Sequence, residues 1–336
     1  METTASTQPV ETVPATRDNN MVWIAGGSFV MGCDIAYPEE APAHQVTVDG
    51  FWIDKYTVTN EEFGRFVDAT GYVTTAERIP KAEDYPGALP EMLVAASVVF
   101  QKSNQPVDLR NHYNWWTYVP GADWRHPEGP KSSIKDRAQH PVVHVSYEDA
   151  EAYAKWIGKD LPTEAEWEFA ARGGMDGAMY AWGEEMNPGR KQMANTWQGE
   201  FPWQNLREDG YEGVAPVGQF PANGYGVYDM IGNVWEWTTD WYAARHPATK
   251  GCCSGDVPKG NREASYDPAQ PEIKIPRKVM KGGSYLCAPN YCRRYRPAAR
   301  MAQAVDTSTC HLGIRLIRRT SHEQTPVSQS CNEGDK

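Results

Sequence analysis

The chain has 336 residues and a formal net charge of −11, which disfavours a nucleic-acid groove or an anionic membrane as its main partner. The longest apolar stretch, residues 92–100, is too short to span a bilayer. The 29 glycines, 25 prolines and 13 tryptophans argue against a helix bundle, because Gly and Pro interrupt helices and aromatic side chains pack well on pleated surfaces. Seven cysteines in so long a chain do not form a disulfide scaffold, and the odd count leaves at least one thiol outside any internal bridge.

Both ends of the chain are polar and aperiodic. Residues 1–20 contain no apolar run and no Lys, which is the pattern of neither a signal peptide nor a transit peptide. We therefore expect disordered tails over residues 1–20 and 319–336, and a single domain over residues 21–318. Without an export signal the expected compartment is the cytoplasm, where thiols stay reduced.

The first elements of the domain are predicted to be strands. Residues 22–24, the pair Gly26 and Gly27, and residues 28–31 together predict a β-hairpin. Val46 and Val48 alternate with polar residues and lead into the apolar segment 51–53, which predicts a second strand region.

Three helices have matched start and stop signals. Each begins with Ser or Thr, has an acidic residue three positions later as in a capping box, and ends at a glycine. The predicted helices run from Thr59 to Gly71, from Ser146 to Gly158, and from Thr163 to Gly173.

Roughly 130 residues after Gly174 show little periodicity and are rich in Gly, Pro, Asn and Trp. The aromatic residues indicate an ordered, loop-rich core, and loops that must stay ordered are often held by metals. Residues 312–317 predict a closing strand. The expected fold class is α+β with little regular secondary structure.

Cys287 and Cys292 are the candidate reactive pair. Their spacing places the two side chains on opposite faces of a strand, or about 140° apart on a helix. The Pro-Asn step between them favours a turn that brings the two sulfurs together. Three arginines follow directly, and their charge favours thiolates over thiols: Arg293, Arg294 and Arg296.

Several interpretations of this pair stay open on the residues alone. Two adjacent thiolates suit a redox disulfide or a soft Cu(I) site, and a purely structural pair is equally compatible. A zinc site is disfavoured because no second cysteine pair stands at zinc-finger spacing, although Cys310 and His311 could add ligands. We expect His144 to be a buried structural histidine. The remaining cysteines receive no assignment: Cys33, Cys252, Cys253 and Cys331.

A set of motifs makes the chain resemble the formylglycine-generating enzyme (sulfatase-modifying factor) family. These motifs are GGSFVMG at 26–32, DKYTVTN at 54–60, PVVHVS at 141–146, LPTEAEWE at 161–168, NGYG at 223–226, GNVWEW at 232–237 and KGGS at 281–284. Several occur in every branch of the superfamily, whereas the stretch 287–300 resembles the copper-dependent, cysteine-bearing branch.

The resemblance implies a single loop-rich domain related to the C-type-lectin-like fold. Family members use O₂ to convert the cysteine of a sulfatase Cys-x-Pro-x-Arg motif into Cα-formylglycine, which activates the sulfatase. By resemblance, Cys287 and Cys292 hold Cu(I), Ser284 and Tyr291 hydrogen-bond to the sulfur or oxygen species, and Trp235 lines the oxygen side. Ser284 as a turn residue and the two aromatics as core residues remain the structural alternatives. The implied partner is an unfolded sulfatase chain, and we expect a monomer.

The resemblance also implies two calcium sites built from hard oxygen ligands. The first comprises Asn195 and Asp209 with the backbone carbonyls of Thr196 and Tyr211. The second comprises Asp229 and Glu236 with the backbone carbonyls of Gly232 and Val234. Taken alone, these residues are also ordinary turn residues, since Asp209 precedes a glycine.

Some positions depart from the family pattern. Pro297 and Leu316 occupy the positions of disulfides found in secretory members, which agrees with a reducing compartment. His311 stands where some members have Asn, which adds a titratable group. Two other functions are considered: a non-catalytic member that binds a peptide or sulfatase, and an iron-dependent sulfoxide synthase. The cysteine pair argues against the first, and the absence of a His-x-x-x-His iron module argues against the second.

Overall fold

The computed structural model describes residues 19–246 and 261–320. The predicted tails lie almost entirely outside the described residues, as do Cys252, Cys253 and Cys331. Arg319, placed in the predicted C-terminal tail, instead ends the last strand, and its guanidinium binds Glu166 at 2.7 Å. In the part of the chain that the structure describes, no helix combines the length and the apolar character needed to cross a membrane.

The three predicted helices are confirmed. They are α1 (Asn60–Thr70), α2 (Tyr147–Ile157) and α3 (Glu164–Arg172). Each has the predicted capping box. The side chain of the N-cap residue accepts from the backbone N–H of N3, three residues later, and the N3 side chain accepts from the N-cap N–H, so both of these N–H groups gain a partner. Each also ends at a glycine in the left-handed region, with φ between 58° and 68°.

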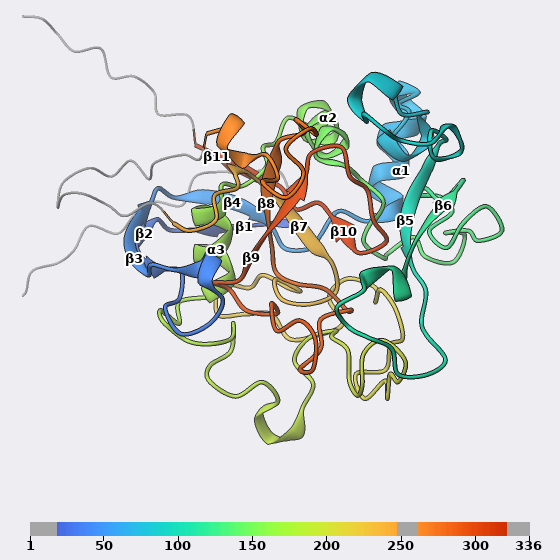
Figure 1. The fold of residues 1–336 in the computed structure, drawn as a ribbon. Helices are drawn as coiled ribbons and strands as arrows, with labels where there is room; N and C mark the ends of the chain where they lie inside the picture. Colours follow the sequence, from blue (N-terminus) through green and yellow to red (C-terminus); the bar gives the residue numbers. More distant parts are fainter. Residues whose placement is uncertain (1–18, 247–260, 321–336) are drawn as a thin grey trace, which may run out of the picture.

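The strands are short and form four separate sheets (Figure 1). They are β1 (Met21–Ile24), β2 (Gly27–Met31), β3 (His44–Val48), β4 (Phe51–Asp54), β5 (Ala96–Phe100), β6 (Trp116–Pro120), β7 (Trp235–Trp241), β8 (Arg277–Lys281), β9 (Arg300–Ala304), β10 (Leu312–Gly313) and β11 (Ile317–Arg319). The sheet orders are β1-β4-β11, β10-β7-β8-β9, β2-β3 and β5-β6.

The predicted hairpin of residues 22–31 is wrong, because β1 and β2 belong to different sheets. β1 pairs antiparallel with β4, and β2 pairs antiparallel with β3. The Gly-Gly step carries the chain from one sheet to the other past the backbone of the β3–β4 turn: a Cβ added at Gly26 would lie 2.5 Å from the Val48 carbonyl oxygen. The glycines therefore allow a close backbone approach rather than a tight turn.

The predicted closing strand over 312–317 is also divided in two. β10 pairs parallel with β7, whereas β11 pairs antiparallel with β4. The chain thus joins two sheets at its end. The expectation of an ordered, loop-rich chain is confirmed: between α3 and β7, a stretch that the structure describes throughout, the only regular element is a short 3₁₀ helix, Pro188–Arg190.

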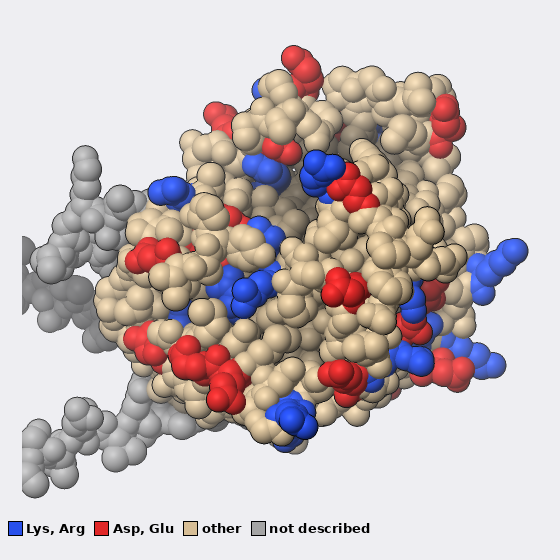
Figure 2. Space-filling view, turned by 60° about the horizontal axis from the view of Figure 1, so that its bottom comes forward, with Lys and Arg blue, Asp and Glu red and all other residues tan. Residues whose placement is uncertain are grey.

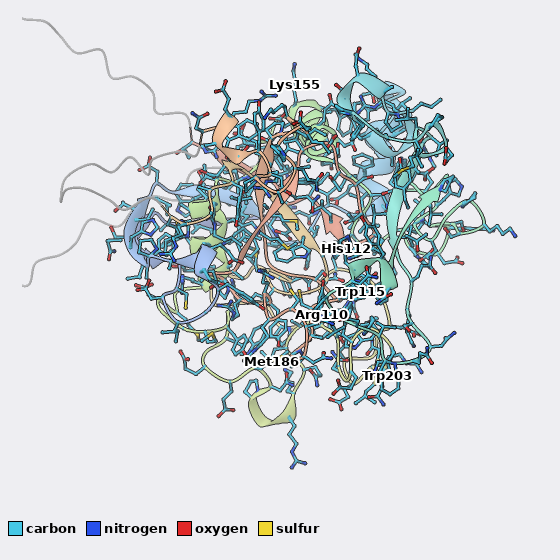
Figure 3. The ribbon with its side chains drawn as sticks, in the orientation of Figure 1. Arg110, His112, Trp115, Lys155, Met186 and Trp203 are labelled. Atoms are coloured by element: carbon cyan, nitrogen blue, oxygen red, sulfur yellow. The ribbon has the colours of Figure 1, made fainter. Side chains whose placement is uncertain are left out.

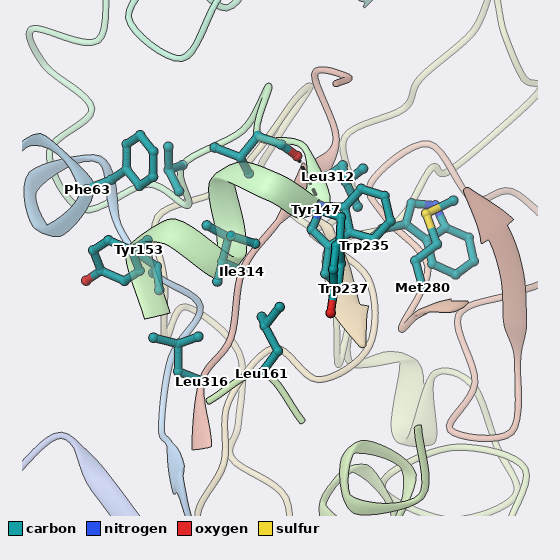
Figure 4. Packing of buried hydrophobic residues seen from close by; sticks show 14 of the residues in the cluster. Phe63, Tyr147, Tyr153, Leu161, Trp235, Trp237, Met280, Leu312, Ile314 and Leu316 are labelled. Atoms are coloured by element: carbon teal, nitrogen blue, oxygen red, sulfur yellow. Dashed lines mark hydrogen bonds between the residues drawn. The ribbon is translucent and has the colours of Figure 1, made fainter. Parts of the chain in front are cut away.

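Three groups of buried apolar side chains hold this arrangement together. One lies between α1, α2 and β7 and includes both Cys287 and Cys292 (Figure 4). A second lies between α3 and the strands β2, β3 and β4. A third is mainly aromatic and lies under the irregular loops; its members include Trp115, Trp197 and Phe201. In Figure 1 the helices and sheets occupy the upper part of the view and loops fill the lower part.

Candidate active site

The segment that carries the two cysteines begins at a buried ion pair. Lys281, the last residue of β8, is fully buried, and its Nζ lies 2.9 Å from the equally buried Glu168 of α3. Gly282 and Gly283 follow with φ of 96° and 73°. A Cβ on Gly283 would lie 2.9 Å from the carbonyl oxygen of Arg294, so glycine is required where the loop folds back on itself.

The sulfurs of Cys287 and Cys292 lie 3.2 Å apart. Two turns bring them together: the Cys287 N–H donates to the Ser284 carbonyl, and the Cys292 N–H donates to the Ala288 carbonyl, each at 2.9 Å. Both cysteines are buried. The prediction that a turn joins the two sulfurs is therefore confirmed.

The two thiols differ in acidity. Burial raises the pKa of Cys287 well above its ordinary value, and its contact with Cys292 adds to that effect. The hydrogen bond from Cys287 lowers the pKa of Cys292, and the Arg294 guanidinium, 3.9 Å from the Cys292 sulfur, lowers it further. The pKa values of the two thiols thus move in opposite directions, so Cys292 is the more acidic of the pair, where the sequence predicted two thiolates.

Only one of the three arginines contacts sulfur. The Arg293 N–H donates to the Tyr37 hydroxyl at 3.0 Å. The Arg296 guanidinium is held by the buried carboxylate of Glu40 at 2.8 Å. The sequence prediction that nearby arginines favour thiolates therefore holds through Arg294 alone.

Ser284 and Tyr291 lie on the same loop as the two sulfurs. Ser284 is fully buried; its N–H donates to the Cys287 sulfur at 3.5 Å, and its hydroxyl accepts from the Leu286 N–H at 3.3 Å. Tyr291 is 38% exposed, and its ring stacks on Phe201 with the centroids 4.4 Å apart and 6° between the planes. Ser284 thus shapes the turn, while Tyr291 faces solvent beside it.

Trp235 comes from a distant part of the chain and packs into the same apolar cluster as the two cysteines. It is buried in β7, and Figure 4 shows it beside Met280 and Leu312. Its N–H donates to the His311 carbonyl at 2.8 Å, which fixes the strand in place. Trp235 therefore shares an apolar cluster with the two cysteines, while Ser284 and Tyr291 lie on the cysteine loop itself.

The sequence did not indicate the aromatic side chains that support this loop. Trp115 meets the Tyr291 ring edge-on at 5.3 Å, and the Trp197 N–H donates to the Cys287 carbonyl at 3.0 Å. Figure 3 shows Trp115 near His112, towards the middle of the view and above the loops that carry Met186 and Trp203. The high tryptophan content was the one sequence signal for this support, and it did not identify the residues.

The histidines and the third buried cysteine have structural partners. His144 is fully buried, with ring nitrogens 2.7 Å from the Ser97 hydroxyl and 2.8 Å from a carbonyl oxygen, which confirms the predicted structural role. The His311 ring lies 5.0 Å from Trp116, and burial lowers its pKa to about 3. Within residues 19–246 and 261–320, no group of three or more His, Cys, Asp and Glu could hold a metal, so Cys310 and His311 do not extend the cysteine pair into such a site.

The residues of the first predicted calcium site lie together. One Asp209 carboxylate oxygen accepts from the Thr196 N–H at 3.2 Å and from the Gln198 amide at 2.8 Å, and the other accepts from the Tyr211 N–H at 2.9 Å. Asn195, next in sequence to Thr196, donates to the Gly213 carbonyl at 2.9 Å. Partial burial raises the pKa of Asp209, while the three hydrogen bonds that it accepts lower it.

The two carboxylates of the second predicted calcium site have hydrogen-bond partners within the protein. Asp229 accepts from the Gly218 N–H at 2.6 Å, and burial raises its pKa to about 6. Gly232 and Val234 lie in the loop that leads into β7. The Glu236 carboxylate is already occupied: it binds the buried Arg315 guanidinium at 2.9 Å, the Trp167 indole at 2.6 Å and the Thr57 hydroxyl at 2.9 Å. Glu236 thus has an internal cation as a partner, and calcium at this second site stays a prediction.

The face of the molecule shown in Figure 2 carries charges of both signs. In Figure 2 basic and acidic side chains are interspersed on the face that is turned forward, and a hollow opens between them. This arrangement differs from the continuous basic surface that a nucleic acid would require.

The structure defines a loop-rich α+β domain that buries two adjacent thiols beside a guanidinium. The family model of the sulfatase-modifying factor enzyme 1-like domain matches residues 6–320, and the chain belongs to this family. A Mycobacterium tuberculosis protein named formylglycine-generating enzyme is 52% identical over 300 residues, which cover 88% of this chain and 97% of that protein.

Two further comparisons define what this similarity shows. A Bos taurus protein named inactive C-alpha-formylglycine-generating enzyme 2 is 44% identical over 301 residues, covering 88% of this chain and 87% of that protein. The solved structure of PvdO from Pseudomonas aeruginosa has a TM-score of 0.58 at 24% identity, covering 89% of this chain and 94% of that one, and shows the fold alone. Since the family includes proteins named as active and as inactive, the site itself must carry the argument for activity.

Proposed function

We propose that this protein uses O₂ and Cu(I) to convert the cysteine of a Cys-x-Pro-x-Arg motif in an unfolded sulfatase into Cα-formylglycine. The observation that carries the proposal is the buried pair of sulfurs 3.2 Å apart on the loop after β8. The similarity to proteins named formylglycine-generating enzyme supports the same reaction and the same kind of substrate.

The residues present fit Cu(I). Two adjacent sulfurs are soft donors, which Cu(I) prefers over the hard oxygen ligands that suit calcium. Arg294 beside the Cys292 sulfur favours its thiolate, and metal binding requires thiolates rather than thiols. When bound, copper would supply the redox chemistry with O₂ that these side chains lack.

The surrounding residues set the environment of the sulfurs. The apolar cluster around Cys287 and Cys292 lowers the local dielectric constant and so strengthens the electrostatic interactions of the two sulfurs. Tyr291 is held at a fixed angle by Phe201 and is exposed, so it can meet a peptide that arrives from solvent. Ser284 holds the Cys287 sulfur in place through its backbone N–H.

The alternative is a non-catalytic member that binds a sulfatase or peptide. The 44% identity to a protein named as inactive favours this alternative. A binding protein has no need for two adjacent buried sulfurs beside a guanidinium, and thiol pKa values shifted in opposite directions are typical of reactive sites. We therefore favour the enzyme.

The proposal includes one structural calcium ion, at the site of Asn195, Thr196, Asp209 and Tyr211. The partly buried Asp209 carboxylate and the backbone carbonyls of Thr196 and Tyr211, whose N–H groups it binds, are the kind of hard ligands that Ca²⁺ prefers. The proposal also includes a cytoplasmic, monomeric protein. Within the described residues, Cys33, Cys287, Cys292 and Cys310 are all free thiols, a state that a reducing compartment preserves.

The test is an aldehyde assay. Protein loaded with Cu(I) is incubated in air with a Cys-x-Pro-x-Arg peptide, and the product is captured with a hydrazide. A matched peptide with Ser in place of the Cys serves as control. Capture of the Cys peptide alone supports the proposal; no aldehyde from protein shown to contain equimolar copper contradicts it.

A further inference from the structure

Two arginines that follow the cysteine pair are held by a segment from the start of the domain. Arg294 binds the Glu39 carboxylate at 2.5 Å, across a sequence separation of 255 residues. Arg296 binds the adjacent, fully buried Glu40 at 2.8 Å. The Tyr37 ring lies 3.9 Å from the guanidinium carbon of Arg294. We call Tyr37 and Glu39, the two residues that hold Arg294, the clamp.

The ion pairs of Arg294 and Arg296 differ in whether the guanidinium also contacts the Cys292 sulfur. Arg294 Nη1 lies 3.9 Å from the Cys292 sulfur, whereas Arg296 donates its Nε hydrogen to the Arg293 carbonyl at 2.9 Å. Glu39 contacts the Nε and Nη2 edge of Arg294, on the side away from Nη1. A planar guanidinium held along one edge and across one face has a fixed orientation, so its remaining nitrogen stays directed at the sulfur.

The geometry points to Tyr37 and Glu39 as positioning residues that hold the Arg294 guanidinium against the Cys292 sulfur and so raise the affinity of the cysteine pair for Cu(I). This inference rests on the proposed function. Two thiolates around one Cu(I) carry a net negative charge, and a fixed cation beside the sulfur offsets it. Arg294 is partly exposed, with its side chain 22% accessible, so without the clamp it would turn towards water.

Glu39 has two opposing effects that an experiment can separate. It fixes the guanidinium beside the sulfur, but its own negative charge offsets part of the positive charge of Arg294. Because the carboxylate lies on the far edge of the guanidinium, it is farther from the sulfur than Nη1 is, and we expect the positioning effect to prevail.

The experiment measures Cu(I) affinity by competition with a chromophoric Cu(I) chelator, in reducing buffer without O₂. Arg294→Met should weaken binding by about tenfold to a hundredfold, a range below the full Coulomb energy because the site is partly solvated. Glu39→Gln should weaken it by about threefold to tenfold. Arg294→Lys should recover part of the affinity that Arg294→Met loses, because it keeps the cation without the fixed fork.

Matched controls separate positioning from general damage. Arg293→Met removes an exposed cation next to Cys292 that makes no contact with its sulfur, and Glu40→Gln breaks the neighbouring ion pair with Arg296, which lies outside the clamp. Both should bind Cu(I) within about twofold of the unmodified protein, after a thermal melt has shown that they are folded. If Glu40→Gln does not fold, Arg293→Met serves as the control.

The outcomes distinguish this inference from the proposed function. Unchanged affinity in Arg294→Met, tighter binding in Glu39→Gln, or an equal loss in Glu39→Gln and its folded control would each overturn the inference while the proposed function stands. If the unmodified protein does not bind Cu(I), both fail. If Arg294→Met does not fold, the comparison of Glu39→Gln with its folded control decides the question.

Discussion

Glu168→Gln removes the charge at the centre of the ion network that anchors the cysteine loop. The Glu168 carboxylate accepts from the Gly32 N–H at 2.9 Å, from Arg172 at 2.7 Å and from Lys281 at 2.9 Å. The side chains of Arg172 and Lys281 are 4% and 0% accessible. Glutamine keeps the shape of the side chain, but it leaves two buried cations facing a neutral amide.

The expected loss of stability is large. Breaking a buried ion pair by removing one partner costs about 3–5 kcal/mol, because the remaining charge stays buried without compensation. Lys281 keeps a second acid, Glu164, at 3.6 Å, so we expect a value near the lower end, about 3 kcal/mol. Lys281 immediately precedes Gly282, so the same change should loosen the turn that holds Cys287.

The assay is urea unfolding followed by tryptophan fluorescence, from which the free energy of unfolding and its denaturant slope are obtained. Glu148→Gln is the matched control, because it breaks an ion pair with Arg78 at 2.8 Å whose side chains are 66% and 43% accessible. That exposed pair should contribute less than about 1 kcal/mol. If Glu168→Gln lowers the free energy of unfolding no more than Glu148→Gln does, the account of the buried network is wrong.

Three further predictions concern pH, metal and packing. Burial lowers the pKa of His144 to about 4 from its ordinary 6.5, so between pH 4 and pH 6.5 the unfolded chain binds a proton that the folded chain does not, and the free energy of unfolding falls as the pH is lowered. His144→Asn should reduce the slope of the free energy of unfolding against pH by up to about 1.4 kcal/mol per pH unit. An unchanged slope would refute the assignment of His144 as a buried neutral histidine. A calcium chelator should lower the melting temperature of the unmodified protein, and Asp209→Asn should no longer show this decrease. If the chelator leaves the melting temperature of the unmodified protein unchanged, calcium has no structural role. Phe201→Ala removes the ring stacked on Tyr291 and leaves a cavity in the aromatic cluster, so unfolding should become easier by about 3–5 kcal/mol and aldehyde formation should slow; a loss below about 1 kcal/mol would show that the stack is not a support.

The features that the sequence predicted well are those determined by neighbouring residues. The capping box of Thr59 and Glu62 and the stop at Gly71 act within one helix, so their pattern is visible in the chain. The turn between Cys287 and Cys292 is equally local. The relation to the C-type-lectin-like fold stays a prediction.

The features that the sequence did not predict depend on distant partners. β1 pairs with β4 rather than with β2. This pairing depends on which apolar side chains each strand buries before and after the Gly-Gly step, and the local pattern does not show it. The contact of Glu39 with Arg294 crosses 255 positions and leaves no periodic signal. Glu236 carries a carboxylate that could bind a metal, but in the structure this carboxylate forms an ion pair with the distant Arg315.

The central claim is that Cys287 and Cys292 together form the reactive centre. The most direct measurement is the yield of aldehyde on a Cys-x-Pro-x-Arg peptide for the Cu(I)-treated unmodified protein and for Cys287→Ala, Cys292→Ala and Cys310→Ala. The last variant is the matched control, because Cys310 is also a buried free thiol but bonds to the Phe100 N–H instead of another cysteine. The account predicts full yield from Cys310→Ala and none from either other variant. Aldehyde at the unmodified rate from Cys287→Ala or Cys292→Ala would contradict it.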